Sequence, residues 1–174
     1  MSIYLRAKHW QLFIVLVGSM FFAQAMMANS IMTGDSPNPL VMAIPTFFMA
    51  VVFFGWLWSV ASACSKVLPT ELASSTKPML FGLVYALVYL LISSSFFFGS
   101  NGQLQGYIIV MHLLAMASIF YALGFTAKQL AKLEQGINVS FFSYSGPFFL
   151  FWFFPIGIWF IQPKVNQLLG GSNA

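Results

Sequence analysis

Charged side chains are so sparse in this chain that they divide it into long apolar runs. Seven Lys or Arg and three Asp or Glu occur among 174 residues, and the 50 residues from 78 to 127 contain none of them. As one helix that run would be about 75 Å long, against about 30 Å for the hydrocarbon core of a bilayer. The run must therefore fold back, and the Gly-rich polar segment 99–106 is where we expect it to do so.

The composition points to the same class of protein. Hydrophobic residues make up 60% of the chain and charged residues 6%, with a mean hydropathy of +0.87. A soluble domain carries about 25% charged residues, because its surface must stay hydrated. The sequence therefore predicts an all-α, polytopic membrane protein. The basic residues are scattered singly or in pairs, so they do not indicate a nucleic-acid partner.

Five apolar segments have the length of a membrane-crossing helix, which is about 20 residues. The longest connector between them has 16 residues, whereas an independent domain needs about 50. We therefore expect residues 1–174 to form a single transmembrane domain with no soluble domain. The predicted spans are 10–28, 40–62, 79–98, 107–127 and 143–162.

The basic residues indicate how the spans are oriented. Five spans would place six of the seven Lys and Arg residues on the side of the N-terminus and only Lys164 on the other side. Cytoplasmic loops carry the excess of Lys and Arg, a rule that holds best for short loops. We therefore expect a cytoplasmic N-terminus and an outer C-terminus (N-in, C-out), in what we take to be a bacterial inner membrane.

Prolines interrupt the fifth predicted span. Pro155 falls in its middle, where a proline removes a backbone hydrogen bond and clashes with the preceding turn, so a kink is expected. Pro147 suits the first turn of this helix and Pro163 suits its exit. The alternative is a re-entrant hairpin, which would return Lys164 to the cytoplasm. We favour the full span, because irregular backbone exposed to lipid is unfavourable.

Residues that support chemistry are scarce. No Asp, Glu, Lys or Arg lies in the middle of a predicted span, whereas ion-coupled carriers place such groups at depth. No carboxylate pair, His-rich cluster, hydrolase motif or phosphate-binding motif occurs. The only cysteine, Cys64, excludes an internal disulfide and a Cys-based metal cage, and we interpret it as a small filler. We expect no enzyme activity, no metal and no cofactor.

His112 is the one weak candidate for cofactor binding. It lies five residues into the span 107–127, about 8 Å from the outer edge. His9 precedes the first span at the opposite interface, so the two histidines cannot share a haem iron. A quinone- or haem-binding role for His112, with Asp35 on the same side, is our third hypothesis. The plainer interpretation is an interfacial histidine bonded to a neighbouring helix or to water.

Small residues and aromatic rings mark candidate contact surfaces. Gly18 and Ala25 lie seven residues apart on one face of the first span, and small residues let helix backbones approach. Residues 141–162 include 11 aromatics, more than interfacial belts require, so Phe149 and Trp152 are candidate interface residues. Two further pairs are attributed to packing inside the bundle: Gly82 with Ala86, and Ser118 with Ala122.

The sequence thus favours a non-catalytic accessory or scaffolding subunit of a larger membrane complex. Its expected partners are membrane lipids and either other integral membrane subunits or copies of itself. The observations behind this are the absence of a catalytic motif and of an extramembrane domain, together with the large apolar aromatic surface. The alternative is a small oligomeric carrier or channel for an uncharged or lipophilic solute.

Overall fold

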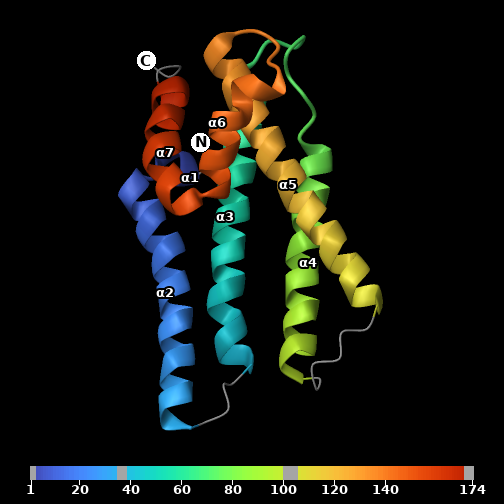
Figure 1. Cartoon of the computed structure of the whole chain (residues 1–174). Helices are drawn as coiled ribbons and strands as arrows, with labels where there is room; N and C mark the ends of the chain where they lie inside the picture. The colour runs from blue at the N-terminus through green and yellow to red at the C-terminus, as the bar shows by residue number, and fades with distance from the viewer. Residues whose placement is uncertain (1–2, 35–38, 100–105, 171–174) are drawn as a thin grey trace.

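The structure, a computed structural model, describes residues 3–34, 39–99 and 106–170, and every regular element within them is a helix (Figure 1). The prediction of an all-helical chain is confirmed for these residues. In chain order the helices are α1 (Ile3–Arg6), α2 (His9–Thr33), α3 (Pro39–Val67), α4 (Lys77–Gly99), α5 (Gly106–Gln135), α6 (Phe141–Trp152) and α7 (Phe154–Gly170).

Four long helices, α2 to α5, run antiparallel through the length of the molecule (Figure 1). Helix α3 packs against α2, α4 and α5, and α4 packs against α5. Three apolar helices are long enough to cross a membrane, namely α2, the part of α3 from Ala43 to Val67, and α5. In α4 the described apolar segment, Lys77–Ser93, is shorter. The four helices coincide with the first four predicted spans and indicate a multi-pass integral membrane protein.

The fifth predicted span is not one helix. Residues 143–162 are divided between α6 and α7, which meet at Phe153. Phe153 has φ −88° and ψ 56°, outside the helical region. The chain reverses there, and α7 packs back against α6 (Figure 1). Where a kink was expected at Pro155, the chain thus makes a full reversal at Phe153, and the count of five spans is not confirmed.

Pro155 and Gly157 explain why the chain reverses. Pro155 is the second residue of α7, where its missing N–H would have no helical partner in any case. Gly157 lies so close to α6 that a Cβ atom would overlap the carbonyl group of Leu150. The proline that disfavours a continuous span is thus compatible with the start of a second helix. Pro163, expected at a helix exit, lies inside α7.

The α6–α7 hairpin brings Lys164 to the same end of the bundle as the other cations. Lys164 Nζ donates to Glu134 Oε2 at 2.7 Å, and Glu134 lies in the last turn of α5. Helix α7 also packs against α1 and α2. We call this end, at the top of Figure 1, the basic end. The segments at this end are α1, the starts of α2 and α4, the ends of α3 and α5, and α7. They contain all seven Lys and Arg residues: Arg6, Lys8, Lys66, Lys77, Lys128, Lys132 and Lys164.

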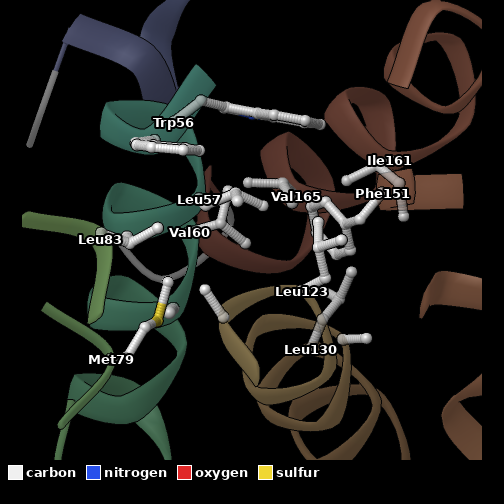
Figure 2. Close-up of a cluster of buried hydrophobic side chains, with 14 of the residues drawn as sticks. Trp56, Leu57, Val60, Met79, Leu83, Leu123, Leu130, Phe151, Ile161 and Val165 are labelled. Carbon is white, nitrogen blue, oxygen red and sulfur yellow. The ribbon is translucent and has the colours of Figure 1, made fainter. Parts of the chain in front are cut away.

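A hydrophobic core joins α3, α4 and α5 to the hairpin (Figure 2). Figure 2 shows Trp56, Leu57 and Val60 of α3 directed toward side chains of the other helices. Phe151 of α6 is fully buried in this cluster, and its ring centroid lies 5.3 Å from that of Trp56. Cys64 is also fully buried there, as expected of a small filler. The hairpin is therefore an integral part of the bundle.

A buried glutamine fastens the hairpin to the start of the chain. Gln162 is fully buried, and its Oε1 accepts a hydrogen bond from Trp56 Nε1 at 2.8 Å. Its Nε2 donates to the carbonyl oxygens of Tyr4 and Ala7, each at 2.9 Å. Because α1 has only four residues, these bonds and the buried side chain of Leu5 hold it in place.

The predicted small-residue pairs meet where α4 crosses α5. A Cβ atom at Gly82 would lie 3.3 Å from the Ser118 Cβ, so the two backbones approach closely at that point. Ala86 and Ala122 are buried beside this contact. The prediction that these pairs serve packing inside the bundle is confirmed. Small side chains are what allow such an approach between helices in a membrane.

Candidate functional site

An apolar cleft of about 390 Å³ lies between α3, α4 and α5 and reaches the turn of the α6–α7 hairpin. Its α3 and α5 residues recur every three or four positions, so each helix contributes one face. The lining residues are Thr46, Met49, Ala50, Phe53 and Phe54 of α3; Ala86, Tyr89 and Leu90 of α4; His112, Ala115, Met116, Ile119, Phe120 and Leu123 of α5; and Trp152 and Phe154 of the hairpin.

The cleft is elongated and follows the axis of α5. Its lining on that helix runs from His112 to Leu123, which corresponds to about 16 Å at the rise of an α-helix. The volume falls within the usual range of small-molecule sites, about 300–1,000 Å³. The cleft therefore has room for a narrow molecule with a chain lying parallel to the helices.

A histidine–tyrosine pair lies toward the end of the cleft remote from the basic end. The Tyr89 hydroxyl is 3.2 Å from His112 Nδ1, and the two ring centroids are 5.7 Å apart. Tyr89 is buried, whereas His112 is exposed. When the hydroxyl donates to Nδ1, the imidazole proton lies on Nε2, which is then free to donate to a carbonyl or hydroxyl oxygen.

The turn of the hairpin covers the other end of the cleft. Trp152, just before the turn, packs on Phe120 of α5 with ring centroids 4.1 Å apart. Phe154, just after the turn, packs on Phe53 of α3 at 5.1 Å. The two halves of the hairpin thus bridge the two helices that form the walls of the cleft. The position of α6 relative to α7 consequently determines how that end is closed.

The electrostatic character of the cleft limits what it can bind. None of the described residues that line it carries a formal charge, and the lining side chains with a polar atom that bears a hydrogen are Thr46, Tyr89 and His112, together with the indole of Trp152 at the hairpin end. An ionised group placed among the other residues would lose its hydration without gaining a partner. The cleft therefore suits an uncharged, largely apolar molecule with a hydrogen-bonding group at one end.

The residues singled out from the sequence are placed in different surroundings. His112 lies in the cleft, which gives this weak candidate a defined partner in Tyr89. Trp152 lines the cleft but is still 42% exposed, and Phe149 is 53% exposed on the outside of the hairpin. Gly18 and Ala25 are exposed on α2. Asp35 lies outside the described residues.

Sequence reasoning missed most of the cleft, including Tyr89 and Thr46. Tyr89 lies 23 positions before His112, and no local spacing connects the two residues. A recognisable signal was the three- to four-residue recurrence of apolar positions on α5, but the same pattern is expected of ordinary helix packing. The contribution of the hairpin was also missed, because a continuous fifth span would have carried Trp152 and Phe154 past this position.

No metal centre is found in the part of the chain that the structure describes, where no three His, Cys, Asp or Glu side chains are grouped closely enough to hold an ion. His9, at the start of α2, packs on Trp159 with ring centroids 4.6 Å apart, far along the bundle from His112. Comparison with family models, with curated proteins and with solved structures finds no match.

Proposed function

We propose that this multi-pass membrane protein binds an uncharged, lipophilic molecule in the cleft between α3, α4 and α5. The observation that supports this best is the uncharged lining, with one polar group of residues at the His112 end. The ligand has an apolar chain beside α5 and a hydroxyl or carbonyl group near His112 and Tyr89. The role is binding or carriage rather than catalysis, because the described lining adds no Asp, Glu, Lys, Cys or Ser to the His112–Tyr89 pair.

A photoreactive long-chain alcohol, carrying a diazirine in its chain, tests this proposal. With protein in lipid nanodiscs, we expect labelling to concentrate on 46–54 and 112–123. Ala115→Phe, which fills the cleft, should lower this labelling at least about five-fold. The labelling that saturates with probe concentration comes from the cleft and should be lost, so that only nonspecific labelling remains. Tyr89→Phe should weaken binding about three- to ten-fold, the worth of one neutral hydrogen bond. Peptide mass spectrometry gives both values.

A neighbouring alanine provides the matched control. Ala117 is two residues further along α5 but is exposed and does not line the cleft, so Ala117→Phe adds the same ring to the outer surface. Its labelling should equal that of the wild type. Equal labelling of both phenylalanine variants would show that the probe samples the general lipid-facing surface, and the proposal would then be wrong. Competition by a long-chain carboxylate as strong as by the alcohol would also contradict an uncharged ligand.

The placement of the cations supports a specific membrane arrangement, with four crossings by α2 to α5 and a hairpin that enters from the cytoplasmic side. With Lys164 beside Glu134, all seven Lys and Arg residues gather at one end, which is the distribution that the positive-inside rule favours. We therefore propose that both termini are cytoplasmic. At the hairpin turn the backbone N–H groups of Phe153, Ile156 and Gly157 donate to carbonyl oxygens within the hairpin, so these groups need no partner from water.

Cysteine labelling of intact cells distinguishes this arrangement from five spans. In a Cys64→Ala background, Met32→Cys at the end opposite the basic end should react with an impermeant thiol reagent. Thr70→Cys and Gln167→Cys should react only after the membrane is permeabilised, because both lie at the basic end. Reaction of Gln167→Cys together with Met32→Cys would place the C-terminus outside and restore a fifth crossing.

A second candidate function is the accessory subunit of a larger membrane complex. The observation that favours it is the outward position of Gly18, where a Cβ atom would meet nothing within 4 Å, and of Ala25 on the same helix. Neither residue serves packing within this bundle, so both remain available to another chain. Phe149 is a further exposed apolar residue, on α6 of the hairpin. The two functions are compatible, and co-purification in mild detergent separates partner chains from bound small molecules.

A further inference from the structure

A second concave surface lies at the basic end, on the side of the bundle formed by α1 and α2. This groove, about 440 Å³ in volume, is distinct from the cleft, with which it shares no residue. One wall is apolar and consists of Leu12 and Val15 of α2 with Val52 of α3. Its polar side chains are those of Tyr4 and Arg6 in α1 and of Gln11 in the first turn of α2.

The short helix α1 holds Arg6 at this groove by contacts on its other sides. Leu5 is buried in the core, and the carbonyl oxygens of Tyr4 and Ala7 accept from Gln162. The Tyr4 hydroxyl lies so close to Gly55 of α3 that a Cβ atom there would be 2.6 Å from it. Arg6 remains exposed and lines the groove. The four-residue helix is thus packed against α3 and α7, while Arg6 stays on its exposed side.

The charge around the groove is positive and uncompensated among the described residues. The ion pair found among the described residues joins Lys164 to Glu134, neither of which lines the groove, and Arg6 is not part of it. Lys8, two residues further on, is exposed as well. Gln11 Oε1 accepts from the Lys8 backbone N–H at 2.8 Å, which leaves the amide Nε2 as a further donor beside Arg6. These groups are donors for an anionic oxygen.

We propose that this groove binds an anionic phospholipid of the cytoplasmic leaflet, with its phosphate at Arg6 and one acyl chain against Leu12, Val15 and Val52. Charge complementarity supports the headgroup, because basic residues at the cytoplasmic ends of spans attract anionic lipids. The apolar wall on two candidate membrane helices supports the acyl chain. An acidic segment of a partner protein would satisfy Arg6 but would not fill this wall. The site is independent of the ligand proposed for the cleft.

Native mass spectrometry of the full chain, titrated with phosphatidylglycerol or with phosphatidylcholine of the same acyl chains, tests the proposal. The wild type should bind the anionic lipid more tightly. Arg6→Gln should weaken the binding of phosphatidylglycerol about five-fold, because one juxtamembrane cation contributes about 1 kcal/mol to the binding of anionic lipid. The affinity for phosphatidylcholine should be unchanged. Lys66→Gln removes an exposed cation from the same end without touching the groove, and should change either affinity less than about two-fold.

Further variants keep the test decisive. Val15→Trp fills the groove without altering charge and should lower the binding of both lipids, while Arg6→Lys should retain most of the preference for phosphatidylglycerol. Equal effects of Arg6→Gln and Lys66→Gln would overturn the proposal, because they would reduce it to nonspecific attraction. Binding of glycerol phosphate as tight as that of the lipid would also overturn it. So would an Arg6-dependent protein partner that binds while lipid binding is unaffected.

Discussion

Gly157→Ala should separate α6 from α7 and strongly destabilise the protein. The added methyl group would overlap the carbonyl of Leu150, and because that neighbour is backbone, no side-chain rotation relieves the overlap. Overpacking with flexible neighbours costs about 1–3 kcal/mol, and a backbone clash belongs at or above the top of that range. We expect the free energy of unfolding to fall by about 3 kcal/mol or more, as measured by thermal or denaturant unfolding in detergent or nanodiscs.

The same substitution should also impair the cleft, because Trp152 and Phe154 are positioned by the contact between the two helices. If α7 moves away from α6, the ring pairs with Phe120 and Phe53 cannot both persist. Labelling by the diazirine alcohol should therefore fall in Gly157→Ala. A protein that loses stability but labels normally would show that the hairpin turn does not close the cleft.

Gly146 offers a matched control in the same hairpin. A Cβ atom there would meet nothing within 4 Å, and Gly146 is an exposed residue inside α6. Replacing a helical glycine by alanine stabilises a helix by about 0.5–1 kcal/mol. The ring of the following residue, Pro147, crowds a Cβ atom at this position in a helix and offsets part of that gain, so Gly146→Ala should change the free energy of unfolding by less than about 1 kcal/mol. If both alanine variants unfolded alike, the close approach of Gly157 to Leu150 would not be important for stability.

The positions of the four long helices could be predicted from the sequence, because their boundaries coincide with abrupt changes in charge. Lys77 begins α4 and the polar segment 99–106 separates α4 from α5. Gly136, in the left-handed conformation at φ 70°, follows the end of α5, where glycine is the favoured residue. These signals are local, and each depends on a few neighbouring residues.

The reversal at Phe153 could not be predicted in this way. A stretch of about 20 apolar residues satisfies the length criterion whether it forms one helix or two, and Pro155 is compatible with a kink as well as with a helix start. What decides between them is the contact of Gly157 with Leu150 and the burial of Phe151 against Trp56. Both depend on tertiary packing. One local signal did favour the hairpin, namely the position of Lys164 just after the fifth predicted span. Of the two arrangements, only the hairpin places Lys164 on the side of the other cations.

The cleft and the Gln162 cluster are likewise invisible to local patterns. His112 drew attention as an ionisable residue, but its significance depends on Tyr89, contributed by another helix. Gln162 lies at the end of the fifth predicted span, where a glutamine would ordinarily mark the exit into the headgroup region. In the structure it is fully buried because the reversal turns α7 back toward α1. The role of Gln162 therefore depends on the reversal at Phe153, which local sequence patterns do not specify.

Gln162→Leu should detach α1 and loosen the hairpin. Leucine has a similar volume but would leave the Trp56 N–H and the carbonyl oxygens of Tyr4 and Ala7 without the partner they have in the wild type. Each buried polar group left unsatisfied costs about 1–3 kcal/mol, so we expect a total loss of about 3 kcal/mol or more. Helix α1 should be affected most, because those two carbonyls are its ties to α7.

Limited trypsin digestion measures the release of α1 directly. Cleavage after Arg6 requires the chain around it to leave its packed position, so Gln162→Leu should accelerate this cleavage at least about ten-fold if about 1.4 kcal/mol or more of the loss falls on local opening. Asn166→Ala is the matched control, since it removes only the longer 3.2 Å contact of Gln162 Nε2 with Asn166 Oδ1, which must share a hydrogen with one of the two carbonyls, and it should change cleavage little. Unchanged cleavage in Gln162→Leu would mean that Leu5 and the Tyr4–Gly55 contact hold α1 without the glutamine.

Because α1 also carries Arg6, its release should weaken phosphatidylglycerol binding in parallel with the faster cleavage. The stability of the hairpin and lipid binding in the groove at the basic end are therefore expected to change together.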